Sequence, residues 1–360
     1  MSGAIKMPRN GTEVDPAQDA AIAAAAVEHG SQNKAAAALG ISRSAVQEAC
    51  KRHAGRLDDA TAPEVPRASP LPPSDLPIEE VVEMMTRRFA VRAARHAAQK
   101  WQRFTVPIAG PYALMFWGDP HVDDDGCNWP LLREHQAIAK NEGVFSVNVG
   151  DTTNNWSGRL ARLYAEQETS ASTARDLAKW FLGSGPKDAQ IPWFLWLHGN
   201  HDAWPGPVGA PWFEAVKPHH VEMRDWQAQI VLVSPGGRDL RLHAAHDFKG
   251  HSQWNPLHGS MKRGQQGEDA HIRVSGHKHN WALFQTEHEH RGIVHWDVRA
   301  RGYKYLDSYG ENLGFGSQRH GASILAVVDP SSAGPGFLQC FADPAEGAEF
   351  LAFKRRKAAA

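Results

Sequence analysis

Apolar residues recur at helical spacing in the N-terminal part of the chain. The stretches with this spacing are residues 17–27, 34–39 and 41–53, and short breaks separate them. At the second break, Gly40 stands where the chain must turn, and the Ser42 hydroxyl can cap the helix that follows. The pattern therefore predicts a unit of short helices within residues 1–57.

A proline-rich segment follows this unit. Residues 58–77 contain almost no bulky apolar side chain and include Pro63, Pro66, Pro70, Pro72, Pro73 and Pro77. This composition predicts an extended, semi-rigid linker. The helical period returns over residues 78–104, where glutamates come early and arginines and lysines late, as suits the helix dipole. We expect a solvated, charged connecting helix there; a basic stripe that follows phosphate groups is the alternative interpretation.

From residue 105 the pattern changes to short apolar runs that end in polar clusters. Such runs predict strands, several of them buried on both faces. Helical stretches over residues 131–140 and 161–182 lie between the first runs, so we expect a layered α/β domain over residues 105–345 and a C-terminal tail over 346–360. The expected strands are residues 113–117, 144–149, 193–197, 230–233, 240–245 and 272–274, followed by antiparallel strands at 282–286, 293–298, 323–328 and 337–341.

The composition is that of a globular protein, with 42% hydrophobic and 22% charged residues, and it excludes a wholly disordered chain. No apolar run approaches the roughly 18 residues of a membrane span, and no signal peptide is recognisable, so we expect a cytoplasmic protein that binds no membrane. The 3 cysteines are far apart and form neither a disulfide framework nor a CxxC pair. A net charge of −1 excludes a protein that coats nucleic acid through its overall charge.

The third predicted helix has two different faces. Its apolar face carries Ile41, Ala45, Val46, Ala49 and Cys50, and its polar face carries Arg43, Ser44, Gln47 and Lys51. Polar and basic side chains of this kind reach base edges and phosphates when a helix lies in the major groove. The unit resembles a helix-turn-helix, which implies that the polar face binds DNA. A helical bundle that packs against a partner protein is the alternative.

Residues that commonly bind metals follow several of the predicted strands directly. They are Asp119, His121, Asp151, Asn200, His277 and His279. Because the strands of an α/β sheet place their carboxyl ends along one crevice, we expect these side chains to converge. Mixed carboxylate, imidazole and amide ligands suit Mn, Fe or Zn better than Ca or Mg.

The motifs DxH, GD, GNHD and GHxH occur in this order between about residues 111 and 300. They resemble those of the calcineurin-like metallophosphoesterases. The resemblance implies two central β-sheets flanked by helices and two divalent transition metals in one site. It also implies metal ligation by Asp119, His121 and His279 at the first metal, by Asn200 and His277 at the second, and by Asp151 as the bridge between them.

One further histidine completes the ligand set that the resemblance implies. His246 is our choice, because the strand over residues 240–245 delivers it to the strand end. The family usually places a glycine after this histidine, whereas here Asp247 follows. His243, His251 and His258 are the alternatives.

His201, beside Asn200, would face the substrate as a general acid or as a stabiliser of developing charge on the leaving oxygen. The family often has a second acid three residues after the bridging aspartate, but this chain has Asn154 there. We expect the Asn154 side chain to hold His201 by a hydrogen bond and to raise its pKa less than a carboxylate would.

The acidic run at residues 123–125 is expected to be a solvated turn. Trp156 and Trp204, which follow site motifs, are expected in the core, with stacking on a base as the alternative.

These features favour a dinuclear metal-dependent phosphodiesterase that hydrolyses DNA, recruited to it by the N-terminal helices. Two ions would lower the pKa of a bridging water and supply hydroxide for an in-line attack at phosphorus. The alternatives are an enzyme for small phosphodiesters or phosphomonoesters with a regulatory N-terminal unit, and a non-catalytic DNA-binding protein on the same fold. The combination looks like phage- or prophage-encoded proteins.

Overall fold

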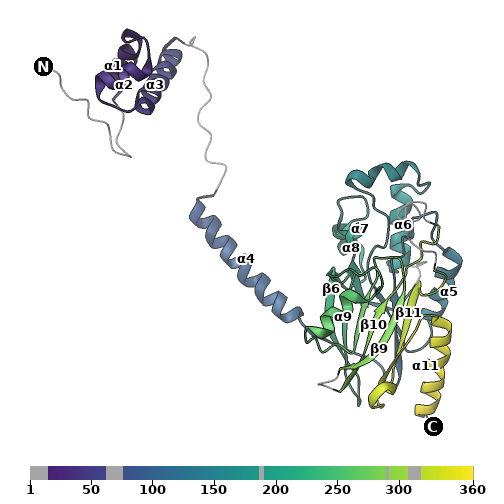
Figure 1. Ribbon diagram of the computed structural model, residues 1–360. Helices are drawn as coiled ribbons and strands as arrows, with labels where there is room; N and C mark the ends of the chain where they lie inside the picture. The colour runs from purple at the N-terminus through teal and green to yellow at the C-terminus, as the bar shows by residue number, and fades with distance from the viewer. Residues whose placement is uncertain (1–14, 62–75, 186–189, 289–291, 307–317, 360) are drawn as a thin grey trace. The chain divides into compact units, whose positions relative to one another are not determined.

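The computed structural model describes residues 15–61, 76–185, 190–288, 292–306 and 318–359. The chain divides into two compact units, Met1–Val81 and Val82–Ala360, and each is described here by itself. Figure 1 shows the helices of the first unit and the layered sheets of the second.

The first unit contains helices α1 (Pro16–Glu28), α2 (Gln32–Leu39) and α3 (Arg43–Thr61). The turn between α2 and α3 has the expected chemistry: Gly40 has a φ of 65°, and the Ala45 N–H donates to the Ser42 hydroxyl at 3.2 Å. Ile22, Val46 and Ala49 lie in the small core between the helices.

A buried carboxylate joins the first and third helices. Asp19 of α1 is 1% exposed and accepts hydrogen bonds from Arg52 of α3 at 2.9 and 3.0 Å. Arg56 forms a second ion pair with the same carboxylate. The hydrogen bond from Arg52 holds the pKa of Asp19 below its ordinary value. The unit therefore combines an apolar core with a charged contact between α1 and α3.

The first unit and the connecting helix end at different residues than the sequence predicts. Residues 58–61, assigned to the linker, belong to α3. None of these four residues is a proline, the residue type on which the linker prediction rests. The rest of the linker, up to residue 75, lies outside the described residues. Helix α4 (Ile78–Gln99) ends before the expected residue 104, since residues 102–105 pair in a sheet instead.

The second unit has two mixed six-stranded sheets. The first contains, in spatial order, β1 (Gln102–Thr105), β6 (Gln227–Val233), β7 (Leu240–Ala245), β8 (Ile272–Ser275), β10 (Ile293–Arg299) and β9 (Ala282–His288). The second contains β12 (Leu338–Phe341), β11 (Ser323–Val328), β2 (Tyr112–Trp117), β3 (Val144–Asn148), β4 (Trp193–His198) and β5 (Glu222–Asp225). Strands β2 to β5 are parallel, whereas β11 is antiparallel to β2.

The central strands of the second sheet, β11, β2, β3 and β4, are buried on both faces. In β2, Leu114 and Phe116 belong to the core between the two sheets, whereas Met115 and Trp117 belong to the core beneath the helices. Alternate side chains of a strand point to opposite faces, so a strand between two apolar layers needs an unbroken apolar run. The prediction of a mixed α/β domain with two sheets flanked by helices is confirmed.

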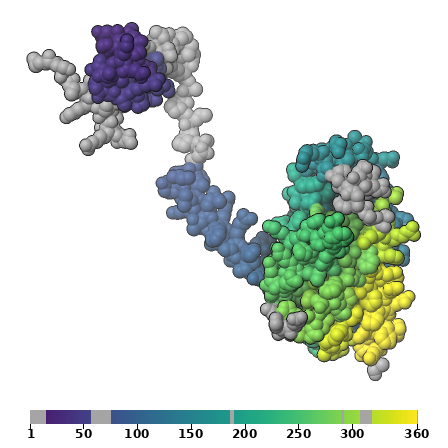
Figure 2. All heavy atoms as spheres, in the orientation of Figure 1, coloured from purple at the N-terminus to yellow at the C-terminus, as the bar shows by residue number. Residues whose placement is uncertain are grey.

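Helices α5 (Trp129–Ala139), α6 (Ala171–Leu182), α8 (Ala210–Val216) and α11 (Pro344–Ala359) cover the second sheet, and α9 (His258–Gln265) packs on the first. The single helix expected over 161–182 is instead a 3-10 helix, η1 (Gly158–Ala165), followed by α6, because Ser170 caps a new helix start through the Thr173 N–H. The prediction that residues 346–360 form a tail is also wrong. Residues 346–359 belong to α11 (yellow in Figure 2), whose Leu351 is 2% exposed against the sheet.

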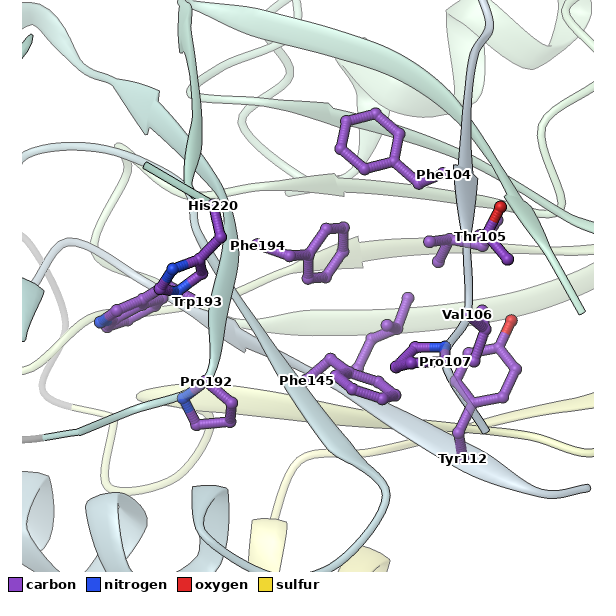
Figure 3. Close-up of a pocket in the computed structure, with 12 residues that line it drawn as sticks. Phe104, Thr105, Val106, Pro107, Tyr112, Phe145, Pro192, Trp193, Phe194 and His220 are labelled. Atoms are coloured by element: carbon purple, nitrogen blue, oxygen red, sulfur yellow. The ribbon is translucent and has the colours of Figure 1, made fainter. Parts of the chain in front are cut away.

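A cavity of about 310 Å³ lies between the sheets at the amino ends of β2, β3 and β4. Phe104, Tyr112, Phe145 and Phe194 line it (Figure 3). The predicted metal ligands follow the carboxyl ends of the same strands, so this apolar cavity is separate from them.

Asp19→Asn tests the charged contact in the first unit. We expect the variant to lose about 1–3 kcal/mol of stability in this unit, the usual worth of hydrogen bonds to a charged group. Because the pKa of Asp19 is lowered, the contact stabilises the unit fully above the ordinary pKa of 3.8 and is lost as the pH falls below it. Hydrogen exchange of the α1 and α3 amides in the full-length protein measures the loss.

Glu48→Gln is the matched control, because Glu48 pairs with Lys51 at 3.8 Å on the surface. A surface pair of this kind contributes at most about 1 kcal/mol, so exchange should hardly change. Equal protection in Asp19→Asn and the wild type at neutral pH would contradict the stabilising role.

Candidate metal centre

The predicted metal ligands lie at the carboxyl ends of five strands that come from both sheets. Asp119 and His121 follow β2, Asp151 follows β3, Asn200 begins helix α7 (Asn200–Ala203) after β4, His246 follows β7, and His277 and His279 follow β8. In the second sheet these strands are parallel, so their loops meet at one edge. The loops of β7 and β8 bring the first sheet's residues to the same place.

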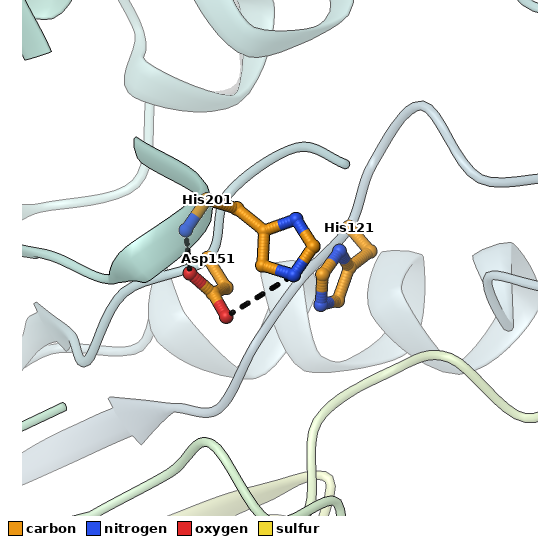
Figure 4. Close-up of side chains that lie close together, drawn as sticks. All are labelled: His121, Asp151 and His201. Carbon is orange, nitrogen blue, oxygen red and sulfur yellow. Dashed lines mark hydrogen bonds and ion pairs between the residues drawn. The ribbon is translucent and has the colours of Figure 1, made fainter. Parts of the chain in front are cut away.

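Asp151 belongs to two groups of side chains that could each hold a metal ion. One group is His121, Asp151 and His201, and the other is Asp151, His246 and His277; in each, the ligand atoms lie within 4.8 Å of one another. Figure 4 shows the first group, with the Asp151 carboxylate facing the His201 ring. A single carboxylate shared by two such groups is the arrangement expected of a bridging ligand.

The remaining predicted ligands join the same cluster. Asp119 lies 3.7 Å from His246 and 3.6 Å from His279, measured between a carboxylate oxygen and a ring nitrogen. The Asn200 side-chain oxygen lies 3.1 Å from His246 Nε2. The structure therefore brings together every residue that was predicted to bind metal, although their metal-binding role stays a prediction.

Several buried polar atoms fit a metal centre. Both ring nitrogens of His121 and the Oδ1 of Asp119 are buried and have no hydrogen-bond partner among the described residues. A buried polar atom without a partner costs about 1–3 kcal/mol. A metal ion would remove that penalty, because imidazole nitrogens and carboxylate oxygens are its natural ligands.

Charge in the cluster is balanced by histidine and carboxylate together. Burial raises the pKa of Asp119, and the neighbouring Asp151 raises it further. Burial opposes ionisation of Asp151 as well, but His246 and His201 hold the pKa of Asp151 below its ordinary value. The same carboxylates raise the pKa of His246 despite its burial. The cluster therefore favours a positive charge at its centre.

Two other histidines are kept neutral. Burial lowers the pKa of His277 to about 3. Burial and the neighbouring His201 and His279 also hold the pKa of His121 well below its ordinary value. Neutral imidazole is the form that binds a metal.

Four residues of the cluster have left-handed backbone conformations. The φ angles are 41° for His121, 51° for Asp151, 68° for His277 and 48° for His279. Residues other than glycine rarely adopt such angles, and strain of this kind gathers at functional sites. Strand β8 ends at Ser275, so His277 and His279 lie in the loop that follows it.

The glycines of the motifs make room for the ligands. A Cβ at Gly150 would lie 2.5 Å from His246 Nδ1, and one at Gly276 would lie 2.7 Å from Asp119 Oδ1. A Cβ at Gly199 would collide with the Asp151 carboxylate. Only glycine permits so close an approach of backbone and ligand.

His246 lies in the cluster, whereas the alternatives His243, His251 and His258 do not. His243 is on the same strand but bonds elsewhere, with its ring nitrogens 2.8 Å from Glu268 and 3.1 Å from Gln227. His251 and His258 are in neither metal-binding group of the described residues. His246 also donates from Nδ1 to the Val149 carbonyl at 2.9 Å, which leaves Nε2 directed at Asp151 and Asn200.

Asn154 holds His201 through its main chain, not through its side chain. His201 Nδ1 donates to the Asn154 carbonyl. The Asn154 side-chain amide donates instead to Asp124 at 2.6 Å and to Gln167 at 3.1 Å. The predicted side-chain contact is therefore wrong, because neighbouring acceptors bind that amide more closely. The nitrogen of His201 that remains available is Nε2, 3.9 Å from Asp151.

In the acidic run at residues 123–125, Asp125 is exposed, as expected of a solvated turn, whereas Asp123 is buried. Asp123 is 2% exposed and accepts from the Asn154 N–H at 2.7 Å. Burial raises the pKa of Asp123 to about 6. Asp124 forms an ion pair with Lys304 at 3.0 Å. The run therefore supports the loop that holds His201, which the charge pattern alone did not reveal.

The structure also locates several tryptophans around the histidines. Trp156 and Trp204 contact the His201 ring at centroid distances of 5.1 and 4.2 Å, and Trp156 is 8% exposed. Trp156 is therefore a packing residue, as expected. Sequence analysis missed Trp226, whose ring lies 5.1 Å from that of His246. Its position between two strands gave no signal of a functional role.

The predicted DNA-binding residues lie on the surface of α3. Arg43, Ser44, Gln47 and Lys51 are all exposed, opposite the buried Val46. Contact with DNA stays a prediction. Among the described residues, no helix is both long enough and apolar enough to cross a membrane.

The sequence matches no protein-family model and none of the curated proteins. Among solved structures, the chain is similar to wild-type Vps29 from Entamoeba histolytica in complex with zinc, with 12% identity and a TM-score of 0.30; the match covers 64% of this chain and 97% of Vps29. It is also similar to GAP50, the anchor in the inner membrane complex of Plasmodium, with 12% identity, a TM-score of 0.35, and 68% and 95% coverage of the two chains. Because identity and TM-scores are this low, we infer function from the geometry of the cluster itself.

His246→Ala tests the ligand assignment. We expect it to lower the metal bound after reconstitution with Mn²⁺ or Zn²⁺ by about one ion per chain, because one group of ligands is broken. Elemental analysis of the desalted protein measures the metal content. His243→Ala, on strand β7 just before His246, is the matched control: it should lose stability but keep its metal. Equal metal content in His246→Ala and the wild type would refute the assignment.

Asn154→Asp tests the corrected role of Asn154. The variant would place a second carboxylate beside Asp124, so we expect about 1–3 kcal/mol less stability at neutral pH. The deficit should shrink as the pH falls, because a protonated carboxyl relieves the repulsion. Urea denaturation measures it, and the double variant Asn154→Asp/Asp124→Asn, which exchanges the two groups, should recover most of it. A fully stable single variant would contradict the contact.

Proposed function

We propose that the protein is a calcineurin-like, two-metal phosphodiesterase that hydrolyses phosphodiester bonds of DNA. The observation that carries the proposal is the shared Asp151, which belongs to both possible metal-binding groups. A bridging carboxylate sets two ions close together, and such pairs catalyse displacement at phosphorus.

When bound, two divalent ions would activate a water molecule and stabilise the attacking and leaving oxygens. The residues of this chain would hold the ions in two groups: Asp119, His121 and His279 on one side, Asn200, His246 and His277 on the other, with Asp151 between them. Neutral His121 and His277 are already in the form that binds metal.

His201 is suited to protonate the leaving oxygen. Its Nδ1 proton is fixed by the Asn154 carbonyl, so the ring is held with Nε2 toward the cluster. The ring packs between Trp156 and Trp204, which restricts its rotation. Its side chain is 12% exposed, which leaves it accessible to a substrate.

DNA as the substrate is supported by the N-terminal part of the chain. The exposed polar face of α3 presents basic and hydrogen-bonding side chains, as a recognition helix does. Helix α4 adds exposed arginines at positions 87, 88, 92 and 95. Separate DNA-binding and hydrolytic parts in one chain fit an enzyme whose substrate is a long polymer.

His201→Ala tests the catalytic proposal. We expect about 10²–10⁴-fold slower cleavage of DNA by the Mn²⁺-loaded protein, the usual effect of removing a general acid. The metal content should stay the same, because Asp119, His121 and His279 would hold the ion on that side without His201. Cleavage of single- and double-stranded DNA and of a small chromogenic diester is measured on the same preparations. A wild-type protein that binds metal but hydrolyses none of these substrates would refute the proposal.

Arg43→Ala/Lys51→Ala tests the recruiting role of α3. Removing two phosphate contacts should weaken DNA binding and reduce the slope of log K against log salt by about 2. Hydrolysis of the small diester is the internal control and should not change. If DNA cleavage is also unaffected at every salt concentration, the enzyme acts on small esters and the N-terminal unit has another role.

A further inference from the structure

Trp226 is the one residue between β5, at the edge of the second sheet, and β6 in the first, so the chain passes from one sheet to the other here. Its N–H donates to the His198 carbonyl at the end of β4, and its carbonyl accepts from the His246 N–H after β7 at 2.7 Å. The crossing therefore lies at the same edge as the metal centre.

The backbone of Trp226 adopts a conformation that favours glycine. Its φ is 49°, in the left-handed region. Glycine would make this crossing without strain. Here the chain has a tryptophan at the crossing, so the contacts of its side chain must offset the free-energy cost of the strained backbone.

The Trp226 ring is held in place yet remains accessible. It packs against the rings of His246 at 5.1 Å and His277 at 6.3 Å, and its Nε1 donates to the Asp247 carbonyl at 3.0 Å. Even so, the residue is 41% exposed. An aromatic ring that is fixed at one edge and open to solvent offers a flat surface for another ring.

A positive side chain stands beside this surface. Lys278, between the two histidines of the GHxH motif, lies 3.6 Å from the Asp247 carboxylate. Its side chain is 38% exposed. Trp226 and Lys278 are thus linked through Asp247, and together they offer a stacking surface and a cation.

We propose that Trp226 stacks on the nucleobase next to the scissile phosphate and that the enzyme acts on single-stranded DNA. The inference rests on the proposed function and deepens it by naming the substrate. In duplex DNA both faces of each base are covered by its neighbours, whereas in a single strand a base is free to stack on an aromatic side chain. Lys278 then lies where it attracts the adjacent phosphate.

The test compares single-stranded oligonucleotides with and without a base beside one phosphate. Binding of an intact strand carrying 2-aminopurine, and of the matching abasic strand, is measured with full-length Mn²⁺-loaded protein immediately after mixing. Wild-type protein should bind the intact strand about tenfold more tightly than the abasic strand and quench the 2-aminopurine fluorescence, since stacking on one aromatic ring is worth this much.

Trp226→Ala should abolish both the preference and the quenching, and Trp226→Phe should keep most of both. Trp226→Gly, which suits the left-handed backbone, replaces the alanine variant if that one does not fold. Trp254→Ala is the matched control, because Trp254 is also an exposed tryptophan, at 88%. It should behave as the wild type does.

An equal loss of affinity for intact and abasic strands in Trp226→Ala would overturn the inference, because Trp226 would then only pack the histidines. Faster cleavage of duplex than of single-stranded DNA by the wild type would overturn it as well. Failure of the proposed function is distinguishable: the wild type would then cleave no DNA, while the base-dependent binding and quenching still report on Trp226.

Discussion

The site depends on one buried carboxylate, that of Asp151. It is 2% exposed and lies 3.2 Å from His246 Nε2 and 3.9 Å from His201 Nε2. A charge removed from water in this way must be compensated by opposite charge and hydrogen bonds close by. Asp151 has a left-handed backbone conformation and Gly199 has no Cβ, so the surrounding backbone can approach the Asp151 carboxylate closely. The other histidines and Asp119 are arranged around the same group.

The sheets could be predicted from the sequence because their strands are short, apolar and clearly bounded. Strand β2 is a representative case, because a short run that is apolar on both faces is typical of a strand between two layers. The ends of the helices were less predictable. Pairing with β6 overrides the helical period at residues 102–104, and packing of Leu351 on the sheet makes a helix of the expected tail. Both effects come from tertiary contacts, which a local pattern does not contain.

The gathering of the predicted ligands in one place was predictable, because the chemistry of each residue and its place after a strand are both visible in the sequence. The contacts around these residues were not predictable from the sequence. The sequence cannot show that the amide of Asn154 turns to Asp124, or that Asp123 is buried beneath the His201 loop. Nor does it show that Trp226 lies against His246, since these residues are distant in sequence and meet only at the crossing between sheets.

The two halves of the centre come from different layers: Asp119, Asp151 and Asn200 follow strands of the second sheet, whereas His246 and His277 follow strands of the first. At their other end the sheets enclose an apolar cavity, so contact between them is incomplete there. Ions bound at the centre would hold the two sheets together at this end. A ligand that binds only the folded state stabilises it in proportion to the logarithm of the free ligand concentration. The supply of metal would thus also set how firmly the two sheets are held together.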